Sequence, residues 1–223
     1  GPTMKIKKLW ILLGLAMIAG CQAADPLSGV NDPHHPWWDL RFSAPYYMTG
    51  WVEMSAVVDI NNRFFPRRGG GAIGIGAFRN DGIEYAHGWA DTGGNGSFVT
   101  GADLPKRVFV RWQSSVEPQT YQGWIEIPEE ARQLMRYSIA RRCAKYPDRP
   151  ASWHPSLTLG LAPGGIVQVW VWDECLRRVA FNRAQVGIEP LGPDLGKSNG
   201  HYFQQTKDSK QYIERFGIPY GSW

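Results

Sequence analysis

Cysteine is scarce in this sequence, and two common kinds of site are missing from it. The 223 residues include only three cysteines, and none forms the Cys-x-x-Cys pair that often binds zinc. Leu191 stands where a nucleotide-binding loop ending in Gly196-Lys197-Ser198 would need its first glycine. The histidines are spread along the chain rather than clustered: His34, His35, His87, His154 and His201. We therefore predict no cofactor, no metal site and no enzymatic activity.

An excess of positive charge is also missing once the N-terminus is set aside. Residues 4–20 join three lysines to an apolar run too short to span a bilayer, which is typical of a secretory signal peptide. Without those three lysines, 21 of the 24 Lys and Arg residues remain against 20 Asp and Glu. A formal charge of +1 argues against a nucleic-acid partner. Residues 1–3 precede the initiator Met4 and are interpreted as a cloning scar.

The signal ends in a lipoprotein-type cleavage site. Small residues at positions 19 and 20 precede Cys21, so we expect Cys21 to carry a lipid and to anchor the protein to a membrane. Gln22 replaces the aspartate that usually retains lipoproteins at the inner membrane, which predicts a periplasmic protein held in the inner leaflet of the outer membrane. Residues 21–36 include three prolines and few apolar side chains, and we predict that they form a flexible tether.

Two cysteines remain after lipidation. In an oxidising periplasm, Cys143 and Cys175 are expected to form a disulfide, although two unpaired buried thiols are the alternative.

Residues 37–223 are predicted to form one domain, a mainly β, antiparallel β-sandwich-like fold with one amphipathic helix packed on it. Short alternating apolar segments indicate strands, at 37–43, 50–60, 107–113, 120–127, 156–161, 166–172 and 176–189. Pro163-Gly164 is typical of a type II turn joining two of these strands. The helix is predicted over 128–142, because proline and two glutamates begin a segment with helical apolar spacing. The glycine-rich section 69–101 is interpreted as irregular surface loops.

One loop has the composition of a protein contact surface. Residues 61–68 combine aromatic side chains with arginines, both of which are enriched in interfaces. Our candidate partner-binding residues are Phe64, Phe65, Arg67, Arg68 and Trp89. A solvated turn whose phenylalanines fold back onto the sheet is an equal alternative, and contact with anionic lipid a weaker one. The 11 tryptophans also leave sugar binding open.

Several motifs resemble those of a family of bacterial lipoproteins known only as a domain of unknown function. They are Val110-Arg111-Trp112-Gln113-Ser114, Leu159-Gly160-Leu161-Ala162-Pro163-Gly164-Gly165 and Gly196-Lys197-Ser198-Asn199-Gly200. Some members of that family are immunity proteins against phospholipase effectors of type VI secretion. The resemblance implies a non-catalytic protein whose partner is a cognate secreted phospholipase or lipase. The alternative is a structural or glycan-binding envelope lipoprotein without catalytic activity.

Overall fold

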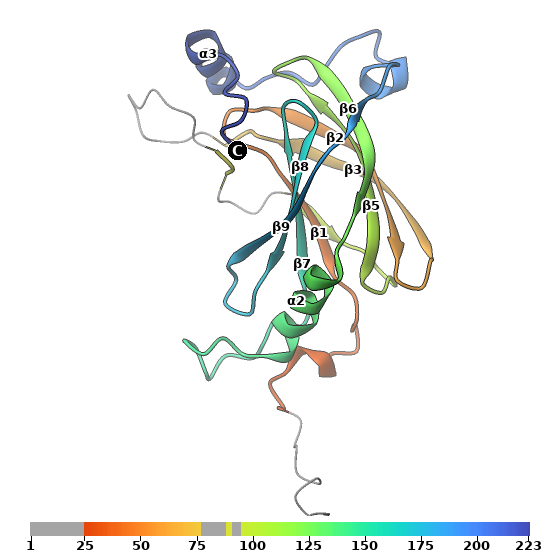
Figure 1. Ribbon diagram of the computed structural model, residues 1–223, viewed down its shortest axis with the longest axis vertical. Helices are drawn as coiled ribbons and strands as arrows, with labels where there is room; N and C mark the ends of the chain where they lie inside the picture. The colour runs from red at the N-terminus through yellow and green to blue at the C-terminus, as the bar shows by residue number, and fades with distance from the viewer. Residues whose placement is uncertain (1–24, 77–87, 91–94) are drawn as a thin grey trace, which may run out of the picture.

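Figure 1 shows the computed structural model, which describes residues 25–76, 88–90 and 95–223. Two five-stranded sheets face each other and enclose the core. The first sheet has the order β4 (Gly96–Phe98), β1 (Asp39–Ser43), β7 (Ser156–Ala162), β8 (Ile166–Trp172) and β9 (Arg178–Gln185). The second has the order β10 (Gly187–Ile188), β6 (Gln119–Glu126), β5 (Pro105–Ser114), β2 (Gly50–Asp59) and β3 (Phe64–Ile73). Neighbouring strands are antiparallel, except for the parallel pair β1 and β7. The predicted β-sandwich is confirmed.

Alternation along each strand decides which side chains enter the core. In β5, Val108, Val110 and Trp112 are buried, whereas Arg107 points outward and is exposed. The largest fully buried side chains come from both sheets, from the residue just before β1 and from the helix that follows β6: Trp38, Leu40, Trp112, Ile125, Met135, Ile139, Leu157, Leu159 and Leu161. In β8, the inward valines at positions 167, 169 and 171 are all buried, because they project into the core that the two sheets enclose.

The predicted helix is confirmed as α2 (Glu129–Ala140), which begins directly after Pro128. Its buried face consists of Ala131, Met135, Ser138 and Ile139 and packs against β8. Glu129 and Glu130 lie in the first turn, where carboxylates favour the positive end of the helix dipole.

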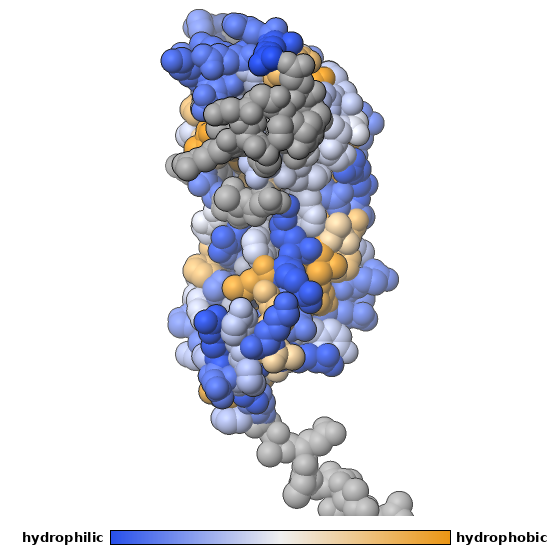
Figure 2. All heavy atoms as spheres, turned by 90° about the vertical axis from the view of Figure 1, so that its left-hand side faces the viewer, coloured by the Kyte–Doolittle hydropathy of each residue, from blue (hydrophilic) through white to orange (hydrophobic). Residues whose placement is uncertain are grey.

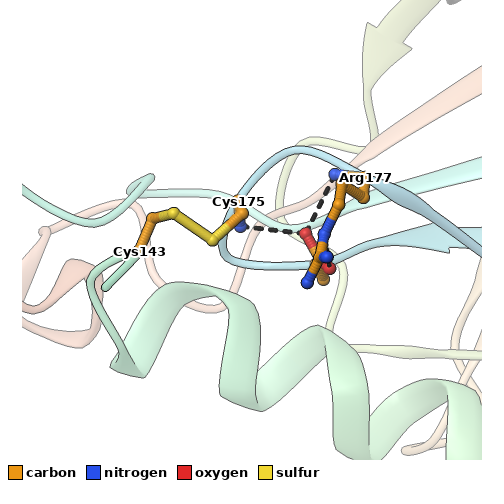
Figure 3. The surroundings of a disulfide bond; sticks show 4 residues. Cys143, Cys175 and Arg177 are labelled. Atoms are coloured by element: carbon orange, nitrogen blue, oxygen red, sulfur yellow. Dashed lines mark hydrogen bonds and ion pairs between the residues drawn. A yellow bond between two sulfur atoms is a disulfide. The ribbon is translucent and has the colours of Figure 1, made fainter. Parts of the chain in front are cut away.

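The predicted disulfide between Cys143 and Cys175 is also present, and the two Cα atoms are 4.9 Å apart (Figure 3). It joins the chain just after α2 to the turn between β8 and β9. In that turn the Asp173 carboxylate accepts hydrogen bonds from the backbone N–H groups of Cys175 and Arg177 and from the Arg177 side chain. The disulfide therefore fixes the end of the helix to the first sheet.

The predicted tether is wrong over residues 25–36, which belong to the folded body. A short 3-10 helix, η1 (Gly29–Asn31), packs against α2. Gly29 is buried so closely that an added Cβ atom would lie 2.1 Å from the carbonyl oxygen of Ser152. Leu27 accepts a backbone hydrogen bond from Ala151 at 2.8 Å. Prolines here shape a packed turn rather than a linker, including a cis peptide bond at His35-Pro36. The predicted signal peptide 4–20 and the predicted lipidation site Cys21 lie outside the described residues.

The interpretation of residues 61–68 and 69–101 as loops is wrong where β3 and β4 form. Only the turn before Phe64 is irregular, and residues 64–73 run along β2 as the edge of the second sheet. Gly70 packs so close to Val52 that an added Cβ atom would lie 2.7 Å from that side chain, which explains why a strand contains glycine there.

A third helical element, η2 (Pro193–Gly196), and a second α-helix, α3 (Lys207–Phe216), follow the sheets.

Candidate functional site

The structure separates the five residues that the sequence proposed as a partner surface. Phe64 is 56 % exposed at the start of β3, whereas Phe65 packs against the core. The Arg67 guanidinium donates hydrogen bonds to the carbonyl oxygens of Ser97 and Phe98, at 3.1 and 2.9 Å, and so links β3 to β4 of the other sheet. The side chain of Arg68 lies outside the described part of the chain. Trp89 lies outside the named strands and packs on the first sheet, where its ring meets the Trp170 ring of β8 edge-on with the ring centres 4.9 Å apart.

Aromatic residues gather instead on the outside of the second sheet. Phe109 in β5 pairs with Trp124 of β6 on one side and with Ala56 of β2 on the other, and Ala56 pairs with Pro66 of β3. The rings of Phe109 and Trp124 are 5.5 Å apart, and Trp124 is 44 % exposed. We call Phe64, Pro66, Phe109 and Trp124 the outer aromatic face.

A positive charge lies beside this face. The guanidinium carbon of Arg107 is 5.1 Å from the centre of the Trp124 ring, in a cation–π arrangement. Arg107 pairs in register with Val58, and Val58 with Phe64, so Arg107 lies in the same row as Phe64. The adjacent row contains Pro66, Phe109 and Trp124. On the face seen from the left-hand side of Figure 1, hydrophobic residues form patches that hydrophilic residues separate (Figure 2). The outer aromatic face thus has the composition of a protein contact surface.

A second candidate site is a pocket of about 270 Å³ on the outside of the first sheet. Parallel pairing of β1 with β7 brings Asp39 and Arg41 next to the segment that contains His154. Asp39 accepts a hydrogen bond from Nε of Arg41 at 2.8 Å, and Nε2 of His154 lies 4.0 Å from the same carboxylate oxygen. Trp172 forms another wall and donates its indole N–H to Thr158.

Two buried polar atoms near this pocket have no hydrogen-bond partner, Oδ1 of Asp39 and Nδ1 of His154. His154 lines the pocket, whereas Asp39 lies behind Arg41 and does not. Burial lowers the pKa of His154 although the Asp39 carboxylate acts in the opposite direction, so the imidazole is neutral at pH 7. The Ser152 hydroxyl donates to the backbone carbonyl of His154 rather than to its ring. The pocket therefore offers an aromatic wall, a neutral imidazole and the charged side chain of Arg41, a combination that suits binding of a small polar molecule.

One segment matches a hydrolase motif by spacing. Gly196-Lys197-Ser198-Asn199-Gly200 has the Gly-x-Ser-x-Gly pattern, which in hydrolases lies on a turn between a strand and a helix. Here it follows the short helix η2, and the Ser198 hydroxyl donates to the carbonyl oxygen of His201 at 2.9 Å. The imidazole of His201 contacts the backbone carbonyl of Ser198, not its hydroxyl. This serine therefore closes a local turn. Within residues 25–76, 88–90 and 95–223, no three His, Cys, Asp or Glu side chains are grouped as a metal site would require.

Comparison with known proteins gives one match. A family model described as "Protein of unknown function (DUF2931)" matches residues 28–221. The chain belongs to this family. The match begins within the segment that packs against α2, in agreement with a folded body that starts before Trp37. No curated protein and no solved structure matches the chain. In the part of the chain that the structure describes, no helix is long and apolar enough to cross a membrane.

Proposed function

We propose that this DUF2931 protein is a periplasmic lipoprotein that protects its own cell by binding a type VI secretion phospholipase or lipase effector. The observation that carries the proposal is the outer aromatic face with Arg107 beside it. Aromatic residues and arginine dominate the binding energy of protein interfaces. A soluble domain gains nothing by leaving such side chains together in water, so a partner that covers them is the simplest reason for their position.

In this proposal, the protein neutralises the effector by binding it and catalyses no reaction. The effector would dock on the outside of the second sheet, and the sandwich would then block its active site or its approach to lipid. A stable complex should bury roughly 1,600 Å² in total, which is more than the four residues of the outer aromatic face supply. We therefore expect the contact to extend along β3 and β6. An anchor at Cys21 would keep the binder at high effective concentration where the effector attacks.

The test uses substitutions on this face together with a matched substitution elsewhere. Trp124→Ala and Phe109→Ala are each expected to weaken effector binding about thirtyfold, which corresponds to roughly 2 kcal/mol. Leu176→Asp is the control, because Leu176 is 67 % exposed and lies in the turn between β8 and β9 of the other sheet. Calorimetry with the purified effector measures affinity, and co-expression with a periplasmic effector measures protection. Equal affinity for all three variants and the parent protein would exclude the outer aromatic face.

The pocket supports a second candidate function, binding of a neutral sugar in the envelope. Sugar rings stack on indole, and their hydroxyl groups can form hydrogen bonds with polar side chains that line the pocket, such as Arg41, His154 and Ser156. The volume of about 270 Å³ is near the lower limit for small-molecule sites, so one sugar ring fits better than a longer glycan.

A pair of tryptophan variants separates the two functions. Trp172→Ala should abolish binding of neutral saccharides, measured by NMR titration, and should leave effector affinity unchanged. Trp124→Ala should weaken effector binding and leave saccharide binding unchanged. Saccharide binding that survives Trp172→Ala, or that is never detected at millimolar concentration, rejects the second function alone.

A further inference from the structure

The segment that would carry the lipid is attached to the folded body almost immediately. Only residues 22–24 separate Cys21 from Asp25. Oδ2 of Asp25 accepts a hydrogen bond from Nε of Arg142 at 2.8 Å, and Oδ1 accepts one from the backbone N–H of Leu27 at 3.0 Å. Four residues of extended chain reach at most about 14 Å. A lipid on Cys21 would therefore hold this end of the sandwich close to the bilayer.

The same end carries exposed basic and aromatic side chains. After α2, residues 144–150 are all exposed, and Cys143 fixes the start of this stretch through the disulfide. The guanidinium of Arg149 lies over the ring of Tyr146 at 4.3 Å, and that of Arg141 over the ring of Tyr137 at 4.5 Å. The two tyrosines are about half exposed, at 51 and 50 %.

Charges at this end do not cancel. Arg141, Lys145 and Arg149 are exposed, and no acidic side chain forms a salt bridge with any of them within the described residues. The acidic groups nearby include three paired ones: Asp25 with Arg142, Asp32 with His34, and Asp173 with Arg177. Asp148 and Glu174, which precedes the disulfide-bonded Cys175, form no salt bridge within the described residues. Among the 10 residues 141–150, four are basic and one is acidic. This end is therefore positively charged and rich in tyrosine.

We propose that residues 25–31 and 141–150 form a membrane-contact surface that rests on anionic phospholipid. The proposal depends on the lipid anchor at Cys21, which is part of the proposed function. Tyrosine is favoured at the boundary between water and lipid, and arginine and lysine are attracted to anionic headgroups. Three cations are too few to hold a domain on a membrane by themselves, but they can orient one that acyl chains already hold there.

The proposal fixes how the sandwich stands on the membrane. The N-terminal part of the described chain and residues 141–150 lie at one end of the molecule, and α3 lies at the other (Figure 1). The long axis would point away from the membrane, with α3 outermost. The outer aromatic face would then be on a side wall, beside the lipid surface on which a phospholipase works.

Hydrogen exchange on the lipidated protein in vesicles tests this orientation. In vesicles of phosphatidylcholine with 30 % phosphatidylglycerol, exchange at the amides of residues 141–150 is expected to slow at least tenfold relative to vesicles of phosphatidylcholine alone. The triple variant Arg141→Glu/Lys145→Glu/Arg149→Glu should lose this protection. The matched control, Lys197→Glu/Lys207→Glu/Lys210→Glu, changes three exposed lysines in or near η2 and α3 and should keep it.

Each contrary outcome overturns the proposal. Equal exchange in the two kinds of vesicle, or protection that survives the triple charge reversal, shows that this end does not contact anionic lipid. Mass spectrometry that finds Cys21 without lipid removes the anchor on which the proposal depends. Effector affinity measured in solution is independent of all three results, so failure of the orientation is distinguishable from failure of the proposed immunity role.

Discussion

Arg67 illustrates at the residue scale how an arginine can resemble a contact residue in the sequence and yet stabilise the fold. Its guanidinium donates to two carbonyl oxygens of β4, which belongs to the other sheet. Arg67→Ala removes a charged donor from both carbonyls and is expected to lower the free energy of unfolding by about 1–2 kcal/mol in urea titrations. Arg107→Ala, which loses only an exposed ring contact, should cost less. An equal loss for both variants would contradict this role for Arg67.

Asp59 is the residue whose titration should matter most for stability at low pH. Its side chain is fully buried, and burial alone would raise the pKa of its carboxyl group. Hydrogen bonds from the backbone N–H groups of Arg63, Asp103 and Asn61 and from the Arg63 side chain outweigh burial and lower the pKa below its usual value. A lowered pKa means that the carboxylate stabilises the fold at neutral pH. This stabilisation is fully present above about pH 4 and is lost as the pH falls through the lowered pKa.

Asp59→Asn should reveal this contribution. The variant is expected to be about 2 kcal/mol or more less stable than the parent protein at pH 7, and the difference should shrink as the pH falls from 4 to 2.5. Urea unfolding across this range measures it. Asp148→Asn, at an exposed position between prolines, should change stability by less than about 0.5 kcal/mol at any pH. A constant difference between Asp59→Asn and the parent protein would show that the charge of Asp59 is not responsible.

At the scale of elements, the sequence predicted the strands and the helix whose own residues carry a recognisable pattern. Alternation identified β1, β2 and β5 to β9, and a proline followed by two glutamates identified α2. In β3, three consecutive glycines interrupt the alternation of apolar and polar side chains, and these glycines lie in a strand because the segment pairs with β2. α3 does carry helical signals, because Tyr212, Ile213 and Phe216 share one side and the Thr206 hydroxyl accepts a hydrogen bond from the backbone N–H of Ser209. α3 is nevertheless not among the predicted elements. Residues 25–36 lack any periodic pattern, and their packing depends on α2 and the chain near Ser152.

The disulfide gives the clearest prediction at this scale, because it connects α2 to the first sheet across 32 positions of sequence. Closing a loop of this length should contribute about 3–4 kcal/mol in the chain-entropy model. Cys143→Ser/Cys175→Ser should therefore lower the urea midpoint while the circular dichroism spectrum stays that of a β protein. A midpoint unaffected by the substitution, or by a reducing agent added to the parent protein, would show that the crosslink adds no stability.

At the scale of the whole molecule, the candidate sites depend on register that no single segment encodes. Phe64 could be predicted as a contact residue because its own segment combines aromatic and basic residues. Phe109 and Trp124, in contrast, meet only through the pairing of β5 with β6. The apolar alternation indicates that both residues lie on strands, but it does not indicate that they share an exposed face. The pocket depends in the same way on the parallel pairing of β1 with β7, which brings Asp39 near His154 across more than 100 positions.

The packing of residues 25–36 leads to a prediction about the lipid anchor that we propose at Cys21. If a short connection holds the sandwich in one orientation, insertion of 15 Gly and Ser residues between Ala24 and Asp25 should release it, since such a linker has a mean reach of about 20 Å. Lipidation and effector affinity in solution should stay unchanged, because the insertion lies outside the folded body. Protection against the periplasmic effector should fall, because the outer aromatic face is no longer kept beside the lipid surface. Competition growth with the effector expressed in the periplasm measures this loss, and full protection by the extended protein would show that proximity to the membrane suffices without orientation.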